Sequence, residues 1–396
     1  METIRLKISD ETLRDGEQQA GLFFDEPTKQ ALASLIAQTG VHQIAVMPAI
    51  HATEERLVRT LVAKGLRSQV TASTLMEPKF IDQSKACGVE RVILFYAISD
   101  RLLFFRDPES RHHLDYRLRP HEDHLPVALR DRIRHNMIQK VLKNLQYAQK
   151  IGLKIDFAAE DASRADFDFL VECIRKFRPY LEHFLLCDTV GLLTPDKTQY
   201  WIHNLLDLTH QAPLAVHFHN DMGLALENTI QAVLAGASGI SGTFGGIGER
   251  AGNVALDQVL NGLRLRCGLQ VDGIHYETLS HVTNYLQQQG IRAHPPYSRE
   301  AQRYEAGIHV NSVLHDRYSY SVFSHGEPEI WFGKCSGASN FQYLFEVLLQ
   351  RPLTPIHYER LRCQVKALSI QEKRSFSTQE VLELLQRKIL KIEEEV

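Results

Sequence analysis

Short apolar runs rich in β-branched and aromatic residues recur along the first two-thirds of the chain, and helical patterns separate most of them. Within 226–237, for example, Leu226, Ile230, Val233 and Leu234 are spaced to share one face of a helix. Eight such strands alternating with helices predict an α/β fold with a parallel sheet, and their number and length fit a closed (β/α)₈ TIM barrel. An open doubly wound sheet is the alternative, but the glycine-rich loop that usually follows its first strand is ETLRDGEQ here. The predicted strands are 4–10, 43–49, 69–75, 91–99, 153–160, 183–190, 214–221 and 239–246.

The regular alternation breaks in two places. Residues 100–126 form a long polar segment after the fourth predicted strand, with histidines at His112, His113, His121 and His124. Solvated loop histidines account for these better than a second metal site does. Beyond residue 270 the pattern becomes irregular and then helical. We therefore predict a barrel over residues 1–270, a linker and lid over 271–330, and a small helical subdomain over 331–396.

Composition and charge narrow the class of protein. The 396 residues carry a formal net charge of −3 and no long run of lysine or arginine, so no nucleic-acid partner is expected. No apolar stretch approaches the ~18–20 residues of a membrane span, and the first residues lack the apolar core of a secretory signal. The six scattered cysteines include no C-x-x-C pair, which favours reduced thiols and a cytoplasmic location.

Polar residues collect where the predicted strands end, which is where a barrel places its functional groups. His217 and His219 lie two apart on one strand, so both side chains project to the same side. Two imidazoles and a carboxylate from another strand would leave metal positions open for substrate. The alternative is two buried histidines with satisfied hydrogen bonds, and the bare H-x-H spacing alone favours it. The other strand-end residues are Asp10, Arg14, Asp15, Gln18, Glu160, Asp161, Asp188, Thr189, Asn220, Asp221, Glu249, Arg250 and Asn253.

Three stretches taken together resemble the signatures of the acyl-CoA-dependent α-keto-acid condensing enzymes. They are DETLRDGEQQAG (10–21), HFHNDMGLALENTIQAVLAGA (217–237) and GGIGERAGN (245–253). That family includes 2-isopropylmalate, homocitrate and citramalate synthases, and the lyase that cleaves hydroxymethylglutaryl-CoA is a relative. Matches at 158–170, 188–195 and 304–317 extend the resemblance across nearly the whole chain.

The resemblance implies a divalent metal held by Asp15, His217 and His219, with Asn253 close enough to complete the shell. The metal would hold an α-keto acid through its carboxylate and carbonyl oxygens. One carboxylate and two imidazoles suit Zn²⁺, Mn²⁺, Co²⁺ or Mg²⁺, and the sequence does not choose among them.

The resemblance also assigns residues to the keto acid. Arg14 would lie against its carbonyl oxygen and stabilise the alkoxide that forms there, while Gln18 and Thr189 match positions that contact this substrate.

The second substrate implied by the resemblance is acetyl-CoA. Its methyl group must lose a proton to attack the keto carbon, and hydrolysis of the thioester then makes the reaction irreversible. His309 matches the family's lid histidine, and Glu160 matches its acidic partner. Tyr320 fits a lid tyrosine at that spacing, with Tyr318 as a near competitor. The family also implies a homodimer in which each lid reaches over the partner's barrel.

Among the possible keto acids, the stretches EDASRADFDFL, AISD, AGIHVNSVLHDR and ALSIQEKRS look closest to homocitrate synthases of the nitrogenase-cofactor type, which use 2-oxoglutarate. The alternatives within the family are 2-isopropylmalate synthase, acting on 2-oxoisovalerate, and a citramalate synthase-like enzyme. A hydroxymethylglutaryl-CoA lyase is a weaker alternative, because GGIGERAGN lacks the cysteine of that relative's catalytic loop. A non-catalytic binding descendant is also weaker, because the signature residues are intact.

Several positions depart from the family pattern around the keto-acid side chain. Relatives place an arginine or histidine near Thr74, and a histidine or lysine where this chain continues RLLFF. Arg101 or Arg106 is a candidate to bind a second carboxylate, since carboxylates favour an arginine or lysine partner. A branched aliphatic substrate would instead need an apolar pocket. The candidates to line that pocket are Leu102, Leu103 and Phe104, and two further departures are Tyr304 and Cys335, each of which replaces a family histidine.

Overall fold

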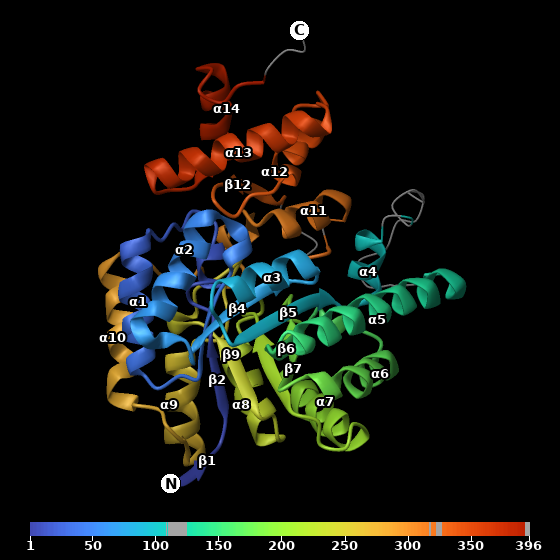
Figure 1. Cartoon of the computed structure of the whole chain (residues 1–396), viewed down its shortest axis with the longest axis vertical. Coiled ribbons are helices and arrows are strands. Elements are labelled where there is room, and N and C mark those ends of the chain that lie inside the picture. Colours follow the sequence, from blue (N-terminus) through green and yellow to red (C-terminus); the bar gives the residue numbers. More distant parts are fainter. Residues whose placement is uncertain (108, 110–124, 317, 322–326, 393–396) are drawn as a thin grey trace.

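Eight parallel strands close into a barrel in the computed structural model, which describes residues 1–107, 109, 125–316, 318–321 and 327–392 (Figure 1). Each strand pairs with its neighbour in sequence, and the last pairs with the first to close the ring. The predicted (β/α)₈ barrel is therefore confirmed, and the open-sheet alternative is excluded. His112, His113, His121 and His124 lie outside the described residues, whereas the first residues of that polar segment form the helix α4 (Asp100–Arg106). The barrel strands are β2 (Lys7–Asp10), β3 (Gln43–Val46), β4 (Val70–Leu75), β5 (Arg91–Ala97), β6 (Lys154–Glu160), β7 (His183–Asp188), β8 (Leu214–Phe218) and β9 (Gly239–Gly242).

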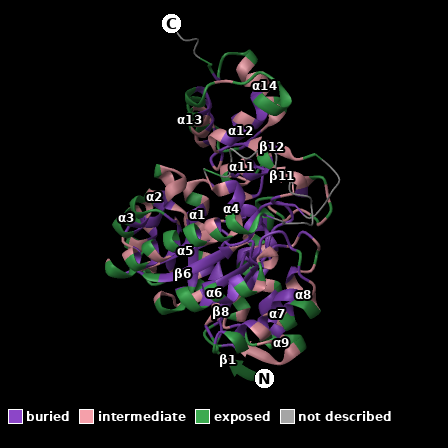
Figure 2. Cartoon of the chain, turned by 90° about the vertical axis from the view of Figure 1, so that its right-hand side faces the viewer, coloured by how far each residue is buried: buried purple, intermediate pink, exposed green. Residues whose placement is uncertain are grey.

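Amphipathic helices cover the outside of the barrel, and their apolar faces form most of the core (Figure 2). In α6 (Phe167–Phe177), Phe169, Leu170 and Ile174 are buried against the sheet. The Asp166 carboxylate accepts a hydrogen bond from the Phe169 amide at 2.9 Å and so caps the start of this helix. The other covering helices are α1 (Glu26–Gln38), α2 (Ala52–Leu61), α3 (Pro78–Ala86), α4 (Asp100–Arg106), α5 (Val127–Lys150), α7 (Pro195–Leu208), α8 (Ala225–Leu234) and α9 (Leu256–Cys267).

Small side chains fill the inside of the barrel. A separate inner cluster contains Ala45, Ala158, Ala215 and Cys187 beside Ile93 and Leu185. Because half of these side chains are alanines, the interior above them keeps room for a cavity at the carboxyl ends of the strands.

All eight barrel strands are one to four residues shorter than predicted, and two of these differences have a structural explanation. The predicted strand 4–10 divides into β1 (Glu2–Ile4), which pairs outside the barrel with β10 (Leu269–Val271), and the barrel strand β2. The predicted strand 239–246 ends at Gly242, because Gly245 and Gly246 have φ angles of 66° and 69° and turn the chain.

From residue 303 onward the described chain packs over the carboxyl ends of the strands, above the barrel in Figure 1, whereas α10 (Leu279–Gln288) packs beside α1 at the side of the barrel. A three-stranded sheet joins the predicted lid to the final helices, and its strands of two to four residues are too short for a sequence pattern to predict. Because this sheet contains residues from both regions, the boundaries at 270 and 330 remain predictions. The elements are α10 (Leu279–Gln288), β11 (Arg303–Tyr304), α11 (Gly307–His315), β12 (Glu329–Phe332), α12 (Ala338–Gln342), α13 (Pro355–Glu372), β13 (Phe376–Ser377) and α14 (Thr378–Gln386).

Within the described part of the chain, none of the helices is both long enough and apolar enough to cross a lipid bilayer.

Candidate metal centre and substrate cavity

A cavity of about 710 Å³ opens at the carboxyl ends of the barrel strands, with α11 of the lid over it. Eight of the ten predicted site residues line it; Asn253 and Tyr320 do not, although both contact the same region from behind. The eight are Arg14, Asp15, Gln18, Glu160, Thr189, His217, His219 and His309.

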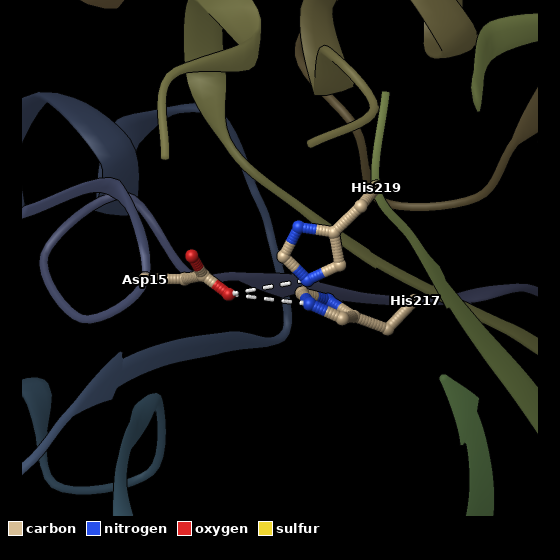
Figure 3. Close-up of side chains that lie close together, drawn as sticks. All are labelled: Asp15, His217 and His219. Carbon is tan, nitrogen blue, oxygen red and sulfur yellow. Dashed lines mark ion pairs between the residues drawn. The ribbon is translucent and has the colours of Figure 1, made fainter. Parts of the chain in front are cut away.

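Asp15, from the segment after β2, points toward His217 and His219 at the end of β8, and only β9 lies between these two strands in the ring (Figure 3). Nε2 of His217 lies 3.3 Å from Oδ2 of Asp15, and Nε2 of His219 lies 3.9 Å from the same oxygen. One potential ligand atom from each side chain lies within 4.8 Å of the others, which is close enough for all three to reach a single ion. Of the two interpretations of the H-x-H pair, the geometry favours the metal ligands.

Unpaired polar atoms around these three side chains support the same conclusion. Among the described residues, Oδ1 of Asp15, Nδ1 of His219 and Oδ1 of Asn253 are buried without a hydrogen-bond partner. Buried polar atoms without a partner are uncommon and need an explanation. Gly248 keeps this space open, because a Cβ atom there would lie 2.3 Å from Nδ2 of Asn253 and 3.2 Å from Oδ1 of Asp15. The donor set fits a divalent metal ion of the kind that carboxylates and imidazoles bind.

The protonation states also suit metal binding. Burial disfavours the carboxylate form of Asp15, but Arg14 and the two histidines outweigh it and hold the pKa of Asp15 well below its usual value. Burial lowers the pKa of His219 well below its usual value, so its imidazole is neutral. Deprotonated carboxylates and neutral imidazoles are the forms that coordinate metals.

Hydrogen bonds with Ser241 and Glu11 orient His217 and Arg14 at the candidate metal centre. Nδ1 of His217 lies 3.1 Å from Oγ of Ser241, and that hydroxyl lies 3.4 Å from Oε1 of Glu11. The other oxygen of Glu11 accepts a hydrogen bond from Nε of Arg14 at 2.6 Å. Glu11 therefore links Arg14 to His217 from below, a role that the sequence did not indicate although Glu11 lies in the first signature stretch.

The lid side of the cavity holds a second set of polar groups. Nδ1 of His309 lies 2.9 Å from Oε2 of Glu249, and the imidazole packs against the ring of Tyr320 with centroids 4.4 Å apart. The hydroxyl of Tyr320 donates a hydrogen bond to Glu160, which also pairs with Nη1 of Arg106 at 2.6 Å. Burial works against ionisation of Glu160, but Arg106 outweighs it and lowers the pKa of this carboxyl.

His309, Glu160 and Tyr320 are thus brought together as the resemblance implied, and Tyr320 rather than Tyr318 contacts Glu160. The carboxylate that pairs with the His309 ring is nevertheless Glu249, which the sequence placed at a strand end without a role. These lid residues meet the barrel of their own chain, so one chain brings the whole set together. The homodimer with exchanged lids remains a prediction.

The residues discussed where this chain departs from the family pattern have different surroundings in the structure, and only some of them lie near the substrate cavity. Arg106 reaches Glu160, whereas Arg101 is buried and pairs with Asp316 at 2.6 Å. Thr74 forms a hydrogen bond with Ser84 at 2.8 Å and is buried within the fold. Tyr304 donates a hydrogen bond to the carbonyl oxygen of Tyr320 at 3.3 Å, and so supports the lid.

The apolar wall of the cavity is not where the sequence suggested. Leu102, Leu103 and Phe104 belong to the core outside the barrel and do not line the cavity, because α4 packs on α5. The apolar side chains that do line it come from the strands and the lid: Met47, Ile93, Phe95, Ala158, Cys187 and Ile308.

Known proteins resemble this chain in sequence and in fold. Residues 5–112 and 123–284 match the HMGL-like family. A homocitrate synthase AksA of Methanothermobacter thermautotrophicus is 32% identical over 325 residues, covering 81% of this chain and 77% of that protein. The 2-isopropylmalate synthase 2 of Caldanaerobacter subterraneus subsp. tengcongensis is 30% identical over 394 residues, covering 97% and 96%.

The (R)-citramalate synthase CimA of Methanocaldococcus jannaschii is 31% identical over 356 residues, covering 87% of this chain and 67% of that protein. Among solved structures, a hydroxymethylglutaryl-CoA lyase from Pseudomonas aeruginosa shares the fold with a TM-score of 0.56 at 19% identity, covering 75% of this chain and 96% of that chain. The extent of the family match and the identity to the synthases agree with the signature stretches and with the barrel. The chain therefore belongs to the HMGL-like family and is an enzyme of its acyltransferase-type condensing synthases.

Proposed function

We propose that this enzyme condenses acetyl-CoA with an α-keto acid in a reaction that depends on a divalent metal and ends with hydrolysis of the thioester. The observation that carries the proposal is the convergence of Asp15, His217 and His219 in a cavity that also presents Arg14. The named activities of the matched synthases support it.

Arg14 is the residue best placed to stabilise the developing negative charge. A bound metal would supply a Lewis acid for the keto acid's oxygens. Nε of Arg14 is held by Glu11, and Nη1 lies 3.3 Å from Asp15, so the guanidinium is fixed beside the ligand set before substrate binds. A preorganised cation stabilises an alkoxide without further reorganisation. Gln18 and Thr189 lie on the same cavity wall and offer polar contacts to the keto acid.

His309 is the residue best placed to accept the proton of the acetyl methyl group. Because Nδ1 faces the Glu249 carboxylate, a neutral ring would carry its proton on Nδ1 and leave the lone pair of Nε2 for the substrate. Glu249 is itself held by Arg250 at 2.5 Å, so the imidazole is oriented by a fixed partner. A base with an orienting carboxylate behind it is a recurrent arrangement for proton abstraction. Glu160 and Tyr320 pack behind His309 and fix its ring from the other side.

The lining of the cavity bears on the choice of keto acid. The stretches EDASRADFDFL, AISD, AGIHVNSVLHDR and ALSIQEKRS favour 2-oxoglutarate, whose second carboxylate needs an arginine or lysine partner. Among the described lining residues, Arg14 is the sole arginine or lysine, and it already serves the reacting end of the substrate. Met47, Ile93 and Phe95 face the rest of the space. The geometry therefore favours an uncharged side chain, as in 2-oxoisovalerate or pyruvate, and homocitrate formation is the second candidate.

The test is thiol release from acetyl-CoA with 2-oxoglutarate, 2-oxoisovalerate and pyruvate, using metal-depleted protein and protein reconstituted with Zn²⁺, Mn²⁺, Co²⁺ or Mg²⁺. We expect activity only after reconstitution, with an uncharged keto acid giving the highest kcat/KM. A clear preference for 2-oxoglutarate would restore the homocitrate assignment. Thiol release from none of the three, or release without metal, would reject the condensation.

A lyase reaction is tested in the same series with hydroxymethylglutaryl-CoA as substrate. The segment after β9 offers glycine, glutamate and arginine but no cysteine, so we expect no cleavage. Cleavage faster than condensation would favour the lyase.

A further inference from the structure

The lid segment of residues 318–321 carries Tyr320 and forms a turn rather than a helix or a strand. Tyr320 is fully buried, its hydroxyl donates a hydrogen bond to Glu160, and its ring packs against His309. A turn lacks the repeated backbone hydrogen bonds that fix a helix or a sheet. The position of Tyr320 over the barrel therefore depends on side chains that reach this segment from other elements.

Arg164 reaches the segment from the barrel. It ends the single helical turn that follows β6 (Ala162–Arg164), and its side chain is only 11% exposed. Nη1 donates a hydrogen bond to the carbonyl oxygen of Tyr318 at 3.0 Å, and Nη2 donates one to that of Ser319 at 2.6 Å. Because one planar guanidinium binds two consecutive carbonyl groups, it fixes the direction of the lid backbone as well as its distance from the barrel.

Asp161 holds the guanidinium of Arg164 in place. Its Oδ1 accepts a hydrogen bond from Nε of Arg164 at 2.7 Å, and its Oδ2 accepts one from the hydroxyl of Ser99. The side chain of Asp161 is fully buried, so little water competes for these bonds. The backbone amide of Asp161 donates to Oγ1 of Thr189 at 2.8 Å, and Thr189 lines the substrate cavity. Asp161 therefore connects the base of this contact to the cavity wall.

The backbone of Asp161 adopts an unfavourable conformation to make these contacts. Its φ and ψ angles are 63° and 32°, in the left-handed region that side chains with a Cβ atom rarely adopt. Such residues persist only where the surrounding structure holds them, and they cluster at functional sites. Asp161 directly follows Glu160, so the turn that carries Arg164 begins beside the carboxylate that binds the Tyr320 hydroxyl.

We propose that Arg164 is a positioning residue that anchors residues 318–321 to the end of β6 and thereby holds Tyr320 and His309 at the substrate cavity. Tyr320 meets the barrel at two places, through its hydroxyl at Glu160 and through the preceding carbonyl groups at Arg164. Two points of attachment fix the ring, which in turn supports the imidazole. Arg164 is not among the described residues that line the cavity, so it acts through Tyr320 rather than on the substrate. This inference rests on the proposed function, since it takes His309 as the base.

The test compares Arg164→Met, Arg164→Lys and Arg178→Met in the reconstituted full-length enzyme. Arg178 is the matched control, because its Nη1 also donates to two consecutive carbonyl oxygens, those of Thr209 at 3.0 Å and His210 at 3.1 Å. Those carbonyl groups follow α7 and do not belong to the described lining of the substrate cavity. A lysine at position 164 keeps the charge beside Asp161 but offers a single nitrogen to the lid backbone.

We expect kcat to fall by roughly 10- to 100-fold in Arg164→Met, since a displacement of about 1 Å in a catalytic group costs this much. Arg164→Lys should lose less, and Arg178→Met should keep the wild-type kcat. The KM for the keto acid should stay within about twofold, because the metal ligands and Arg14 are unchanged. The isotope effect on kcat with trideuterated acetyl-CoA should rise in Arg164→Met, because slower proton abstraction limits turnover more strongly. A partly unfolded preparation would lower kcat without changing the isotope effect.

Amide hydrogen exchange without substrate provides a measurement that needs no turnover. Residues 318–321 should exchange faster in Arg164→Met than in the wild type, and Arg178→Met should leave their exchange unchanged. Equal exchange in Arg164→Met and the wild type, or an unchanged isotope effect, would overturn the assignment. A wild-type enzyme that releases no thiol with any keto acid would instead defeat the proposed function, and the exchange measurement would still decide whether Arg164 anchors the lid.

Discussion

The two ends of the barrel carry similar groups of residues, but their buried aspartates differ in whether hydrogen-bond partners satisfy both carboxylate oxygens. At the amino end, Asp156 accepts hydrogen bonds from Lys7 and Gln43, each at 2.8 Å, and lies 3.4 Å from His183. At the carboxyl end, Asp15 faces two histidines but leaves Oδ1 without a hydrogen-bond partner among the described residues. Each cluster combines a buried aspartate, histidine and a basic side chain.

The difference lies in where the strands place each cluster. Lys7, Gln43 and His183 are the first residues of their strands, and the space among them is a pocket of about 270 Å³. Asp15 and His219 follow the ends of β2 and β8 and face the cavity of about 710 Å³. Both carboxylate oxygens of Asp156 accept hydrogen bonds, so this aspartate stabilises the fold, whereas Asp15 has an unmatched oxygen beside a cavity and is available to a ligand. The types of residue alone therefore do not distinguish the structural cluster at the amino end from the candidate metal centre at the carboxyl end.

The largest expected effect is loss of activity in Asp15→Asn. An amide in place of the carboxylate removes the charged ligand, and a metal that supplies several kcal/mol of transition-state stabilisation corresponds to a fall in kcat/KM of about 10³-fold or more. The measurement is turnover together with metal content of the purified protein. Asp156→Asn is the matched control and should retain both. An Asp15→Asn enzyme with normal metal content and turnover would contradict the assigned ligand.

Asp156→Asn should lower the free energy of unfolding, whereas its metal content and turnover should stay normal. The substitution leaves Lys7 largely buried without its main counter-charge, which costs about 3 kcal/mol. Urea unfolding followed by circular dichroism measures the change, and Asp15→Asn in metal-free protein serves as the comparison. Equal unfolding free energies for Asp156→Asn and the wild type would show that the amino-end cluster does not stabilise the barrel.

Low pH should reduce the free energy of unfolding through protonation of Asp156. Burial disfavours the charged form of Asp156, but His183 and Lys7 outweigh it and hold its pKa below the usual value of the carboxyl. Because the folded-state pKa of Asp156 lies below the unfolded value of ~3.9, the ionised carboxylate stabilises the fold fully above that pH. The stabilisation is lost as the pH falls from there toward the folded-state pKa. Unfolding free energies measured from pH 6 to pH 3 should fall less steeply for Asp156→Asn than for the wild type. Parallel curves would refute the link.

The smallest effect expected is a weaker metal site in Ser241→Ala. This hydroxyl lies 3.1 Å from Nδ1 of His217 and orients the imidazole, and loss of such an outer partner reduces metal affinity by about 10- to 100-fold. Competition with a chromophoric chelator measures the affinity. Ser9→Ala is a matched control, since Ser9 lines the amino-end pocket and its hydroxyl has no hydrogen-bond partner in the described chain. Equal affinities in both variants would assign Ser241 no role at the metal.

The sequence predicted the barrel because eight apolar runs alternate with helical patterns, and these are properties of neighbouring residues. It grouped Asp15 with His217 and His219 only through the resemblance, because residues 202 positions apart (217 − 15) share no local pattern. The pairings of His309 with Glu249 and of Arg106 with Glu160 escaped prediction for the same reason. Strands β11 and β13 have two residues each and show no periodicity that could reveal them.

Glu17 belongs to a buried group of four charges, which also contains Lys29, Glu54 and Lys334, and its position there has a dynamic consequence. Glu17 lies in the single helical turn that follows Asp15, and its carboxylate contacts Lys334 of the C-terminal region. The loop that carries a candidate metal ligand and the helices that cover the barrel therefore share one set of ion pairs, and local opening of either disturbs the other. Metal added to the native protein should slow amide hydrogen exchange in α13 as well as in the barrel loops, so that helices far from the ion report its binding.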